Sequence, residues 1–172
     1  MTSALVYAAI KEQKQMITNV ESWLEKGVAH ANARAFDPAV LLAARLAPDQ
    51  YPLLRQIQSV CDSAKFTAAR LADKDPPKHP DTEQTLDEIR ARIETCKAYL
   101  DTFKPADFEG AETRLVPLPF MPGKVLTGLA FLFELQLPNF FFHATTAYAI
   151  LRHNGVNLGK TDYIGSLSVR DR

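Results

Sequence analysis

The stretch LPNFFFHATTAYAILRHNG, Leu137–Gly155, decides the fold of the chain because it predicts one buried amphipathic helix. Its apolar residues recur at spacings of four, three and four and form one stripe: Phe140, Ala144, Ala147 and Leu151. Pro138 fits either the first turn, where a missing N–H costs nothing, or a kink in a longer helix. Asn154 and Gly155 predict the C-terminal stop, with Val156 packing back onto the last turn.

Three more long helices are predicted before this stretch. The first covers residues 3–26 and ends at Gly27, the second covers about 51–72, and the third begins at Thr82 or Thr85. The second and third helices each carry an apolar seam with 3-4-3-4-3 spacing, which is typical of helical bundles. The seams are Leu54, Ile57, Cys61, Ala64, Ala68 and Leu71, and then Leu86, Ile89, Ile93, Cys96, Leu100 and Phe103.

The connections between these helices are mostly expected to be irregular. Residues 28–36 predict a loop with a solvated His30, after which Asp37-Pro38 starts a short extra helix. Residues 74–81, KDPPKHPD, predict a polar loop in which His79 is exposed.

The regions on either side of the last helix also depart from regular helix. Residues 105–128 predict a loop with a short extended hairpin that turns at Pro122-Gly123. The tail after Gly155 is expected to be irregular, with its apolar residues packed on the bundle: Val156, Leu158, Tyr163 and Ile164. On the third helix, Glu88 and Arg92 are expected to form an exposed ion pair.

These elements predict an all-α fold, an up-down four-helix bundle in a single domain over residues 1–172. A short extra helix follows the first long helix, and a small extended hairpin precedes the last one. No internal repeat or second domain is indicated.

Composition and charge argue against several classes of protein. The 20 basic and 20 acidic residues balance to a net charge of zero, which disfavours a nucleic-acid binder or a basic membrane surface. The most apolar window, 129–142, falls short of the ~20 apolar residues that a membrane-spanning helix needs.

The N-terminus lacks the basic region of a signal peptide. Cys61 and Cys96 lie on apolar stripes, so we expect buried thiols in a reducing, cytoplasmic environment.

Chemistry is indicated at one place, where Asn139 and His143 stand four residues apart on one face of the last helix. The second helix offers Gln58 and Asp62 at the same spacing. Bundles build metal sites from inward polar side chains on facing helices, although Asn and Gln are poor ligands for a transition metal. A lone His beside an apolar stripe is more often a core imidazole that hydrogen-bonds a neighbour.

Two segments resemble a bacterial and fungal family of unknown function, which is grouped with the DinB/YfiT-like metalloenzymes. They are RLAPDQYPLLRQIQSVCDSAK at Arg45–Lys65 and LPNFFFHATTAYAILRHNGVNLGKTDYIG at Leu137–Gly165. The resemblance implies a four-helix bundle that is often a homodimer. In the wider superfamily three His bind a divalent metal, one from the second helix and two from an HxxxH motif on the last helix.

The resemblance also implies that the metal site is altered in this chain. His143 matches the second His of the HxxxH motif, whereas the first His falls on Asn139. The second helix has no His at all, and Gln58 or Asp62 stands nearest to the expected position.

Two hypotheses for function follow. The first is a DinB-like bundle of unknown function that binds a small molecule near Asn139, His143, Gln58 and Asp62, or serves as a dimeric scaffold, with no certain cofactor. The second is a thiol transferase or hydrolase-like enzyme in which His143 and Asp62 hold a divalent zinc or nickel ion. A purely structural role for His143 is a third possibility.

Overall fold

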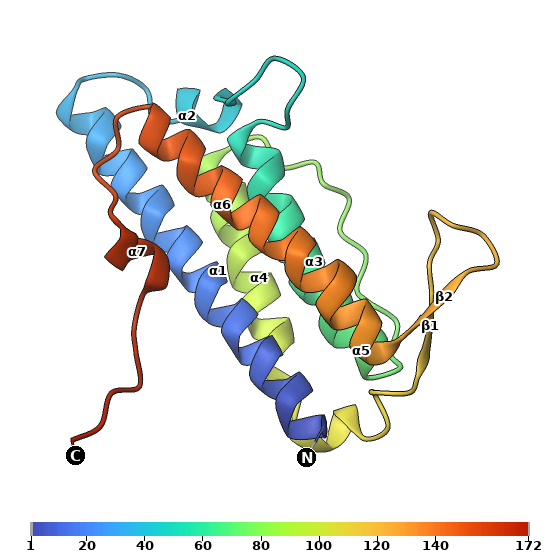
Figure 1. The fold of residues 1–172 in the computed structure, drawn as a ribbon. Coiled ribbons are helices and arrows are strands. Elements are labelled where there is room, and N and C mark those ends of the chain that lie inside the picture. The colour runs from blue at the N-terminus through green and yellow to red at the C-terminus, as the bar shows by residue number, and fades with distance from the viewer. Residues whose placement is uncertain (1, 172) are drawn as a thin grey trace.

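The computed structural model describes residues 2–171 and consists of one helical bundle. Four long helices pack side by side: α1 (Thr2–Ala33), α3 (Leu53–Leu71), α4 (Leu86–Asp101) and α6 (Leu137–His153) (Figure 1). Their apolar faces form one core, whose largest fully buried side chains include Trp23, Phe108 and Phe140. This arrangement confirms the predicted all-α four-helix bundle.

The directions of the helices depend on the linker between α3 and α4. In Figure 1, α1 and α6 run in one direction while α3 and α4 run in the other. An extended chain covers about 3.3 Å per residue and a helix about 1.5 Å. Residues 72–85 are therefore long enough to return the chain along the whole of α3 before α4 begins. The order is up, down, down, up, which differs from the alternating order expected for an up-down bundle.

The first helix, α1, continues past its predicted end because Gly27 serves packing and does not stop the helix. A Cβ placed on Gly27 would come within 3.2 Å of the Leu151 side chain and 3.3 Å of the Leu41 side chain. The missing side chain allows α6 and the short α2 (Val40–Ala43) to approach α1 closely. His30 consequently lies in the last turn of α1, so the predicted loop position was wrong.

Thr85 begins α4, which decides between the two predicted caps. The Thr85 hydroxyl accepts a hydrogen bond from the Glu88 N–H at 3.2 Å, and the Glu88 carboxylate accepts one from the Thr85 N–H at 2.9 Å. This reciprocal capping box occupies the Glu88 carboxylate. The Arg92 side chain is only 2% exposed and pairs with other carboxylates, so the predicted exposed Glu88–Arg92 pair was wrong.

The predicted hairpin is confirmed. It follows a short 3₁₀ turn, η1 (Pro105–Phe108). β1 (Leu115–Pro117) pairs antiparallel with β2 (Val125–Thr127), which forms a two-stranded sheet. Gly123 has a φ of 76° in the connecting turn, a conformation that glycine adopts without steric cost.

The last long helix is part of a longer helical run, as the second alternative for Pro138 predicted. α5 (Gly128–Ala130) and a π-helical segment, η2 (Phe131–Gln136), lead directly into α6. The Leu137 N–H donates to the carbonyl of Leu132, five residues back, and this widens the turn. The wider turn accommodates Pro138, which has no N–H and whose ring would clash with the carbonyl four residues earlier in a regular α-helix.

The predicted stop of α6 is confirmed. Gly155 has a φ of 86°, and the Val156 N–H donates to the Leu151 carbonyl at 3.1 Å. This is the Schellman geometry that satisfies the last free carbonyls of a helix. Val156 is buried, so the end of α6 is also anchored by packing.

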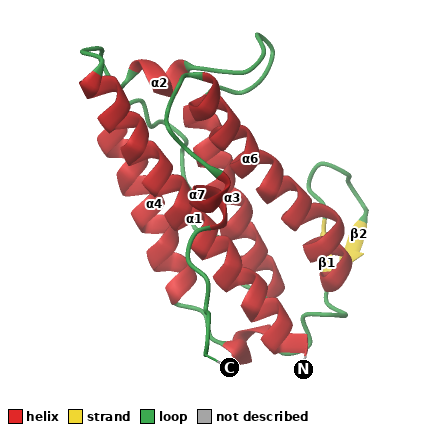
Figure 2. Cartoon of the chain, turned by 60° about the vertical axis from the view of Figure 1, so that its left-hand side comes forward, coloured by secondary structure: helices red, strands yellow, loops and turns green. Residues whose placement is uncertain are grey.

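The tail is more ordered than the sequence predicts, because it forms the short helix α7 (Lys160–Ile164) packed against α1 (Figure 2). The Trp23 indole N–H donates to the Asp162 carbonyl at 2.9 Å. The Trp23 ring also stacks on the Tyr163 ring, with 5.4 Å between their centroids. A side chain from α1 therefore holds a segment whose own sequence carries no helical periodicity.

Cys61 and Cys96 are buried free thiols, as predicted. The Cys96 thiol donates to the Cys61 carbonyl at 3.3 Å, which joins α3 to α4. Within residues 2–171, no helix is long and apolar enough to cross a membrane.

Gly128 offers a test of how tightly the start of α5 is packed. An added Cβ would lie only 1.7 Å from the Ala111 carbonyl oxygen. We predict that Gly128→Ala lowers the free energy of unfolding by about 1–3 kcal/mol, since backbone must move to make room. Urea unfolding followed by circular dichroism measures this change. In the control Gly159→Ala, the added Cβ meets nothing closer than 3.8 Å, so a change below about 0.5 kcal/mol is expected. Equal losses would contradict the packing argument.

Candidate functional site

Polar side chains of α3 and α6 meet in a row that we call the polar seam: Gln56, Ser63, Asn139 and His143. His143 Nδ1 lies 2.7 Å from the Gln56 amide oxygen. About two turns further along α3 and one turn back along α6, the Asn139 amide donates to the Ser63 hydroxyl at 2.6 Å. Gln56 and Ser63 are buried, whereas His143 is half-buried and Asn139 is exposed. The seam thus reaches from the core to the surface.

The hydrogen bonds around Gln56 determine the tautomer of His143. The Gln56 amide nitrogen donates to the Tyr51 carbonyl at 3.1 Å, which leaves the amide oxygen facing His143. An amide oxygen only accepts, so His143 Nδ1 must carry the proton. In the neutral imidazole, Nε2 then has a free lone pair. Within residues 2–171, Nε2 has no hydrogen-bond partner and is not among the buried unpaired atoms.

The surroundings of His143 also favour its neutral form. Burial lowers the pKa of His143, and the positive charge of Arg55 lowers it further. A neutral imidazole with a free lone pair can accept a hydrogen bond, take up a proton or bind a metal ion.

The structure gives Gln58 and Asp62 different partners from those of Asn139 and His143. Gln58 donates to Glu83 at 2.8 Å, and Asp62 accepts from Lys65 and Arg92 at 2.6 Å each. At about 100° per residue, Gln58 points roughly 200° away from Gln56 around α3, so the two side chains leave the helix on opposite sides. The structure therefore brings Asn139 and His143 together with Gln56 and Ser63 of α3, and not with Gln58 and Asp62.

The sequence contains one pattern that indicates the α3 side of the polar seam, and it is not among the predicted site residues. Gln56 and Ser63 are seven residues apart, and this spacing keeps both on the side of α3 that faces α6. The spacing of Gln58 and Asp62 also matched a helix face, but it did not say which neighbouring helix that face meets.

A second cluster, the Arg92 cluster, joins α3, α4 and the linker between them. The Arg92 guanidinium lies 2.6 Å from Asp62, 3.1 Å from Asp81 and 3.1 Å from Glu83. Arg55 pairs with the other oxygen of Asp81 at 2.5 Å. Burial opposes the charge of Arg92, but the carboxylates outweigh it and raise the pKa of Arg92. The linker is thus held to both helices by ion pairs, of which those to Arg92 end on a buried guanidinium.

His79 belongs to this cluster, so its predicted exposure was wrong. Its side chain is 11% exposed, and Nδ1 lies 3.2 Å from the Lys65 amino group. Burial lowers the pKa of His79, and the charges of Arg92 and Lys65 lower it further. A linker residue can be largely covered because the linker lies against α3, where His79 meets Lys65 and Asp62.

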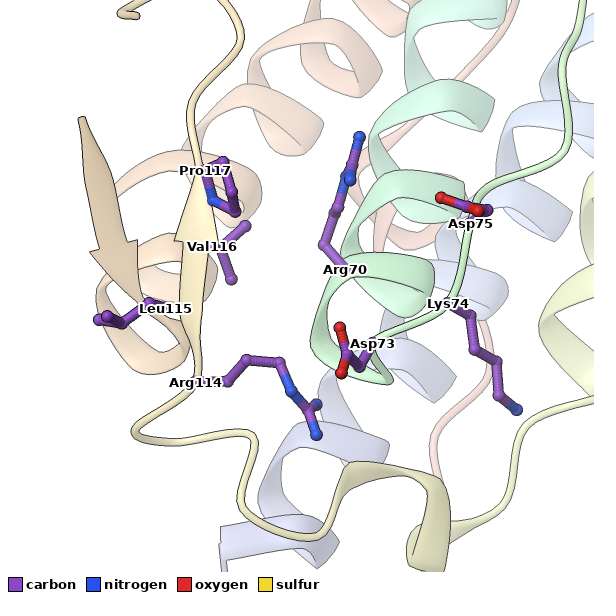
Figure 3. Close-up of a pocket in the computed structure, with 8 residues that line it drawn as sticks. All are labelled: Arg70, Asp73, Lys74, Asp75, Arg114, Leu115, Val116 and Pro117. Carbon is purple, nitrogen blue, oxygen red and sulfur yellow. The ribbon is translucent and has the colours of Figure 1, made fainter. Parts of the chain in front are cut away.

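Several hollows lie along α3. One, of about 290 Å³, is lined by Arg70 of α3, by linker residues 73–75, and by Arg114 and the strand β1 that follows it (Figure 3). A larger one, of about 870 Å³, lies under the linker beside Lys65 and His79. A third, of about 250 Å³, has mostly apolar walls and opens beside the hairpin.

The side chains of the polar seam do not fit the three-His metal site that the resemblance implies. The seam offers one imidazole together with two amides and a hydroxyl, which are poor ligands for a transition metal. The part of the chain that the structure describes contains no group of three or more His, Cys, Asp or Glu that could hold a metal ion.

Comparisons with known proteins place the chain in a family. The model of a domain of unknown function, DUF1993, matches residues 5–164. The chain belongs to this family. A crystal structure of a DinB family member from Shewanella denitrificans has a TM-score of 0.96 at 42% identity, and the match covers 99% of this chain and 98% of that chain. The comparison with curated proteins found no match. The resemblance to DinB-like bundles is therefore confirmed.

The DUF1993 bundle should depend on the Arg92 cluster for stability. We predict that Arg92→Met lowers the free energy of unfolding by about 3–5 kcal/mol, because it removes the buried cation that three partly buried carboxylates share and leaves Glu83 without a cation. Urea unfolding measures the loss. The matched control is Arg90→Met, since Arg90 is 33% exposed and pairs with Glu25 at the surface. That change should cost at most about 1 kcal/mol, and equal losses would show that the cluster is not structurally important.

The pKa of His143 can be tested directly by NMR titration of its ring protons. We predict a value below the ordinary one of about 6.5, because burial and Arg55 disfavour the charged ring. Arg55→Gln should raise the pKa of His143 part of the way back. The unfolded state then binds the proton more tightly than the folded state does. The stability that neutral His143 contributes is therefore complete above the ordinary pKa, and it is lost as the pH falls through the lowered pKa of the folded state. A pKa at or above that of an unfolded reference peptide would contradict this account.

Proposed function

We propose that this DUF1993 bundle binds a small molecule carrying a hydrogen-bond donor, and that the polar seam is the binding site. The observation that carries the proposal is the state of His143. Its tautomer is fixed by Gln56, its neutral form is favoured, and its Nε2 lone pair has no partner within residues 2–171. A half-buried acceptor of this kind is suited to a ligand N–H or O–H group.

An apolar surface beside His143 supports the same proposal. The Phe142 ring lies 5.3 Å from the imidazole, centroid to centroid, and is 55% exposed. Phe142 also lines a hollow of about 470 Å³ together with Leu46 and Phe141. Ligand sites commonly combine an apolar wall with a few polar groups that fix orientation. A ligand with an apolar body and one donor group would match both features.

The composition of the seam favours binding without a metal ion. Asn139 stands where the resemblance implies a second His, and its amide is already used by Ser63. Asp62, the other ligand of the enzyme hypothesis, is occupied by two cations. The hypothesis that His143 and Asp62 together hold a metal ion stays a prediction, and these contacts do not support it.

The proposal is tested by screening small phenols, indoles and anilides against the untagged protein with saturation-transfer NMR. We expect compounds that bind the wild type to be lost in His143→Ala and retained in the control His153→Ala, whose side chain is exposed. Elemental analysis of the same preparations should find zinc and nickel well below one ion per chain.

Two results would overturn the proposal. One is a bound compound that His143→Ala retains as well as the wild type does, since the seam would then not be its site. The other is stoichiometric metal that disappears in His143→Ala and stays in His153→Ala, which would favour the metalloenzyme hypothesis.

We also propose a cytoplasmic location, which the two buried free thiols support because reducing compartments preserve them. The homodimer implied by the resemblance and the role of a dimeric scaffold stay predictions. Neither is needed for binding at the seam, because all four seam residues come from one chain.

A further inference from the structure

Arg70 lies near the C-terminal end of α3 and lines the hollows on both sides of this helix. Figure 3 shows its guanidinium in the gap between β1 and Asp75, turned away from Asp73. Among residues 2–171 the guanidinium has no hydrogen-bond or ion-pair partner, since no carboxylate oxygen comes within 4.0 Å. Nearby cations differ in this respect, because Lys74 pairs with Asp107 and Arg114 donates to the Leu71 carbonyl.

The hollow beside the hairpin places an apolar pocket directly against this cation. It holds about 250 Å³, and its walls come from α3, η2 and the hairpin: Phe66, Leu118, Phe120, Phe131 and Leu135. Among residues 2–171, Arg70 is the one charged residue that lines it, so no acidic side chain of this part of the chain competes for the guanidinium within the hollow.

Gln136 supplies a second polar group to the same hollow. Its amide oxygen lies 3.5 Å from the Thr67 hydroxyl, whereas its amide nitrogen has no partner in the described part of the chain. Gln136 is 9% exposed and is one of the residues that line the hollow. The hollow therefore combines two donors, a guanidinium and an amide, with an otherwise apolar wall.

We propose that the hollow beside the hairpin binds a small organic carboxylate with an aromatic or branched apolar body, and that Arg70 binds its carboxylate. The guanidinium can donate two parallel hydrogen bonds to one carboxylate, which is the geometry that Arg favours. The apolar body would cover Phe66 and Phe120, whose side chains are 36% and 66% exposed. This site shares no residue with the polar seam, so it does not rest on the function proposed above.

Naphthoate and naphthamide test the proposal, because they share a shape and differ in charge. Isothermal titration should show that the wild type binds naphthoate more tightly than naphthamide. We expect Arg70→Gln to weaken naphthoate about tenfold, which equals about 1.4 kcal/mol, and to leave naphthamide unchanged. Arg70→Lys should give a smaller loss because an ammonium lacks the planar fork. Phe120→Ser should weaken both compounds.

Two controls establish whether binding is specific to Arg70 and this hollow. Arg34→Gln removes the same charge from an exposed position and should change neither affinity. His143→Ala should also change neither, whatever it does at the polar seam. Equal naphthoate and naphthamide affinities in the wild type, or equal naphthoate affinities in Arg70→Gln and Arg34→Gln, would overturn the proposal.

Discussion

The buried guanidinium of Arg92 is the group on which the arrangement of the bundle depends. It binds Asp62 of α3 and two carboxylates of the linker, Asp81 and Glu83, while its own backbone belongs to α4. Three separate segments must therefore meet at one point, since a buried charge without partners costs several kcal/mol. These ion pairs hold the extended linker along α3 and allow α4 to start at the same end of the bundle as α3. The parallel direction of α3 and α4 follows from this.

The same arrangement assigns the two polar faces of α3. One face contacts the linker and α4, so Gln58 hydrogen-bonds Glu83 of the linker and Asp62 pairs with Arg92 of α4. The other face meets α6 and carries Gln56 and Ser63, which hold His143 and Asn139. Gln56 is itself oriented by the Tyr51 carbonyl, so His143 uses Nδ1 for Gln56 and its Nε2 has no partner within residues 2–171. Structural polar groups and candidate functional ones thus lie on opposite sides of a single helix.

Much of the fold could be predicted because it depends on local patterns. The apolar seams located α3, α4 and α6, Thr85 and Gly155 marked helix ends, and the hairpin turned at the expected Pro122-Gly123. Local rules failed where a distant residue decided the outcome. Gly27 looked like a stop but accommodates the Leu151 side chain, and the tail becomes helical because Trp23 holds it.

The sequence by itself determined which residues could form helices, where most of them end, and that His143 stands on a helix with Asn139. These properties depend on neighbours within about one helical turn or a heptad. Only the tertiary structure decided which face of α3 meets α6, that Arg92 is buried and His79 mostly so, and that Arg70 has no partner among residues 2–171. The physical reason is that burial and charge pairing join residues far apart in the chain, and helical spacing alone contains no information about which helix lies opposite.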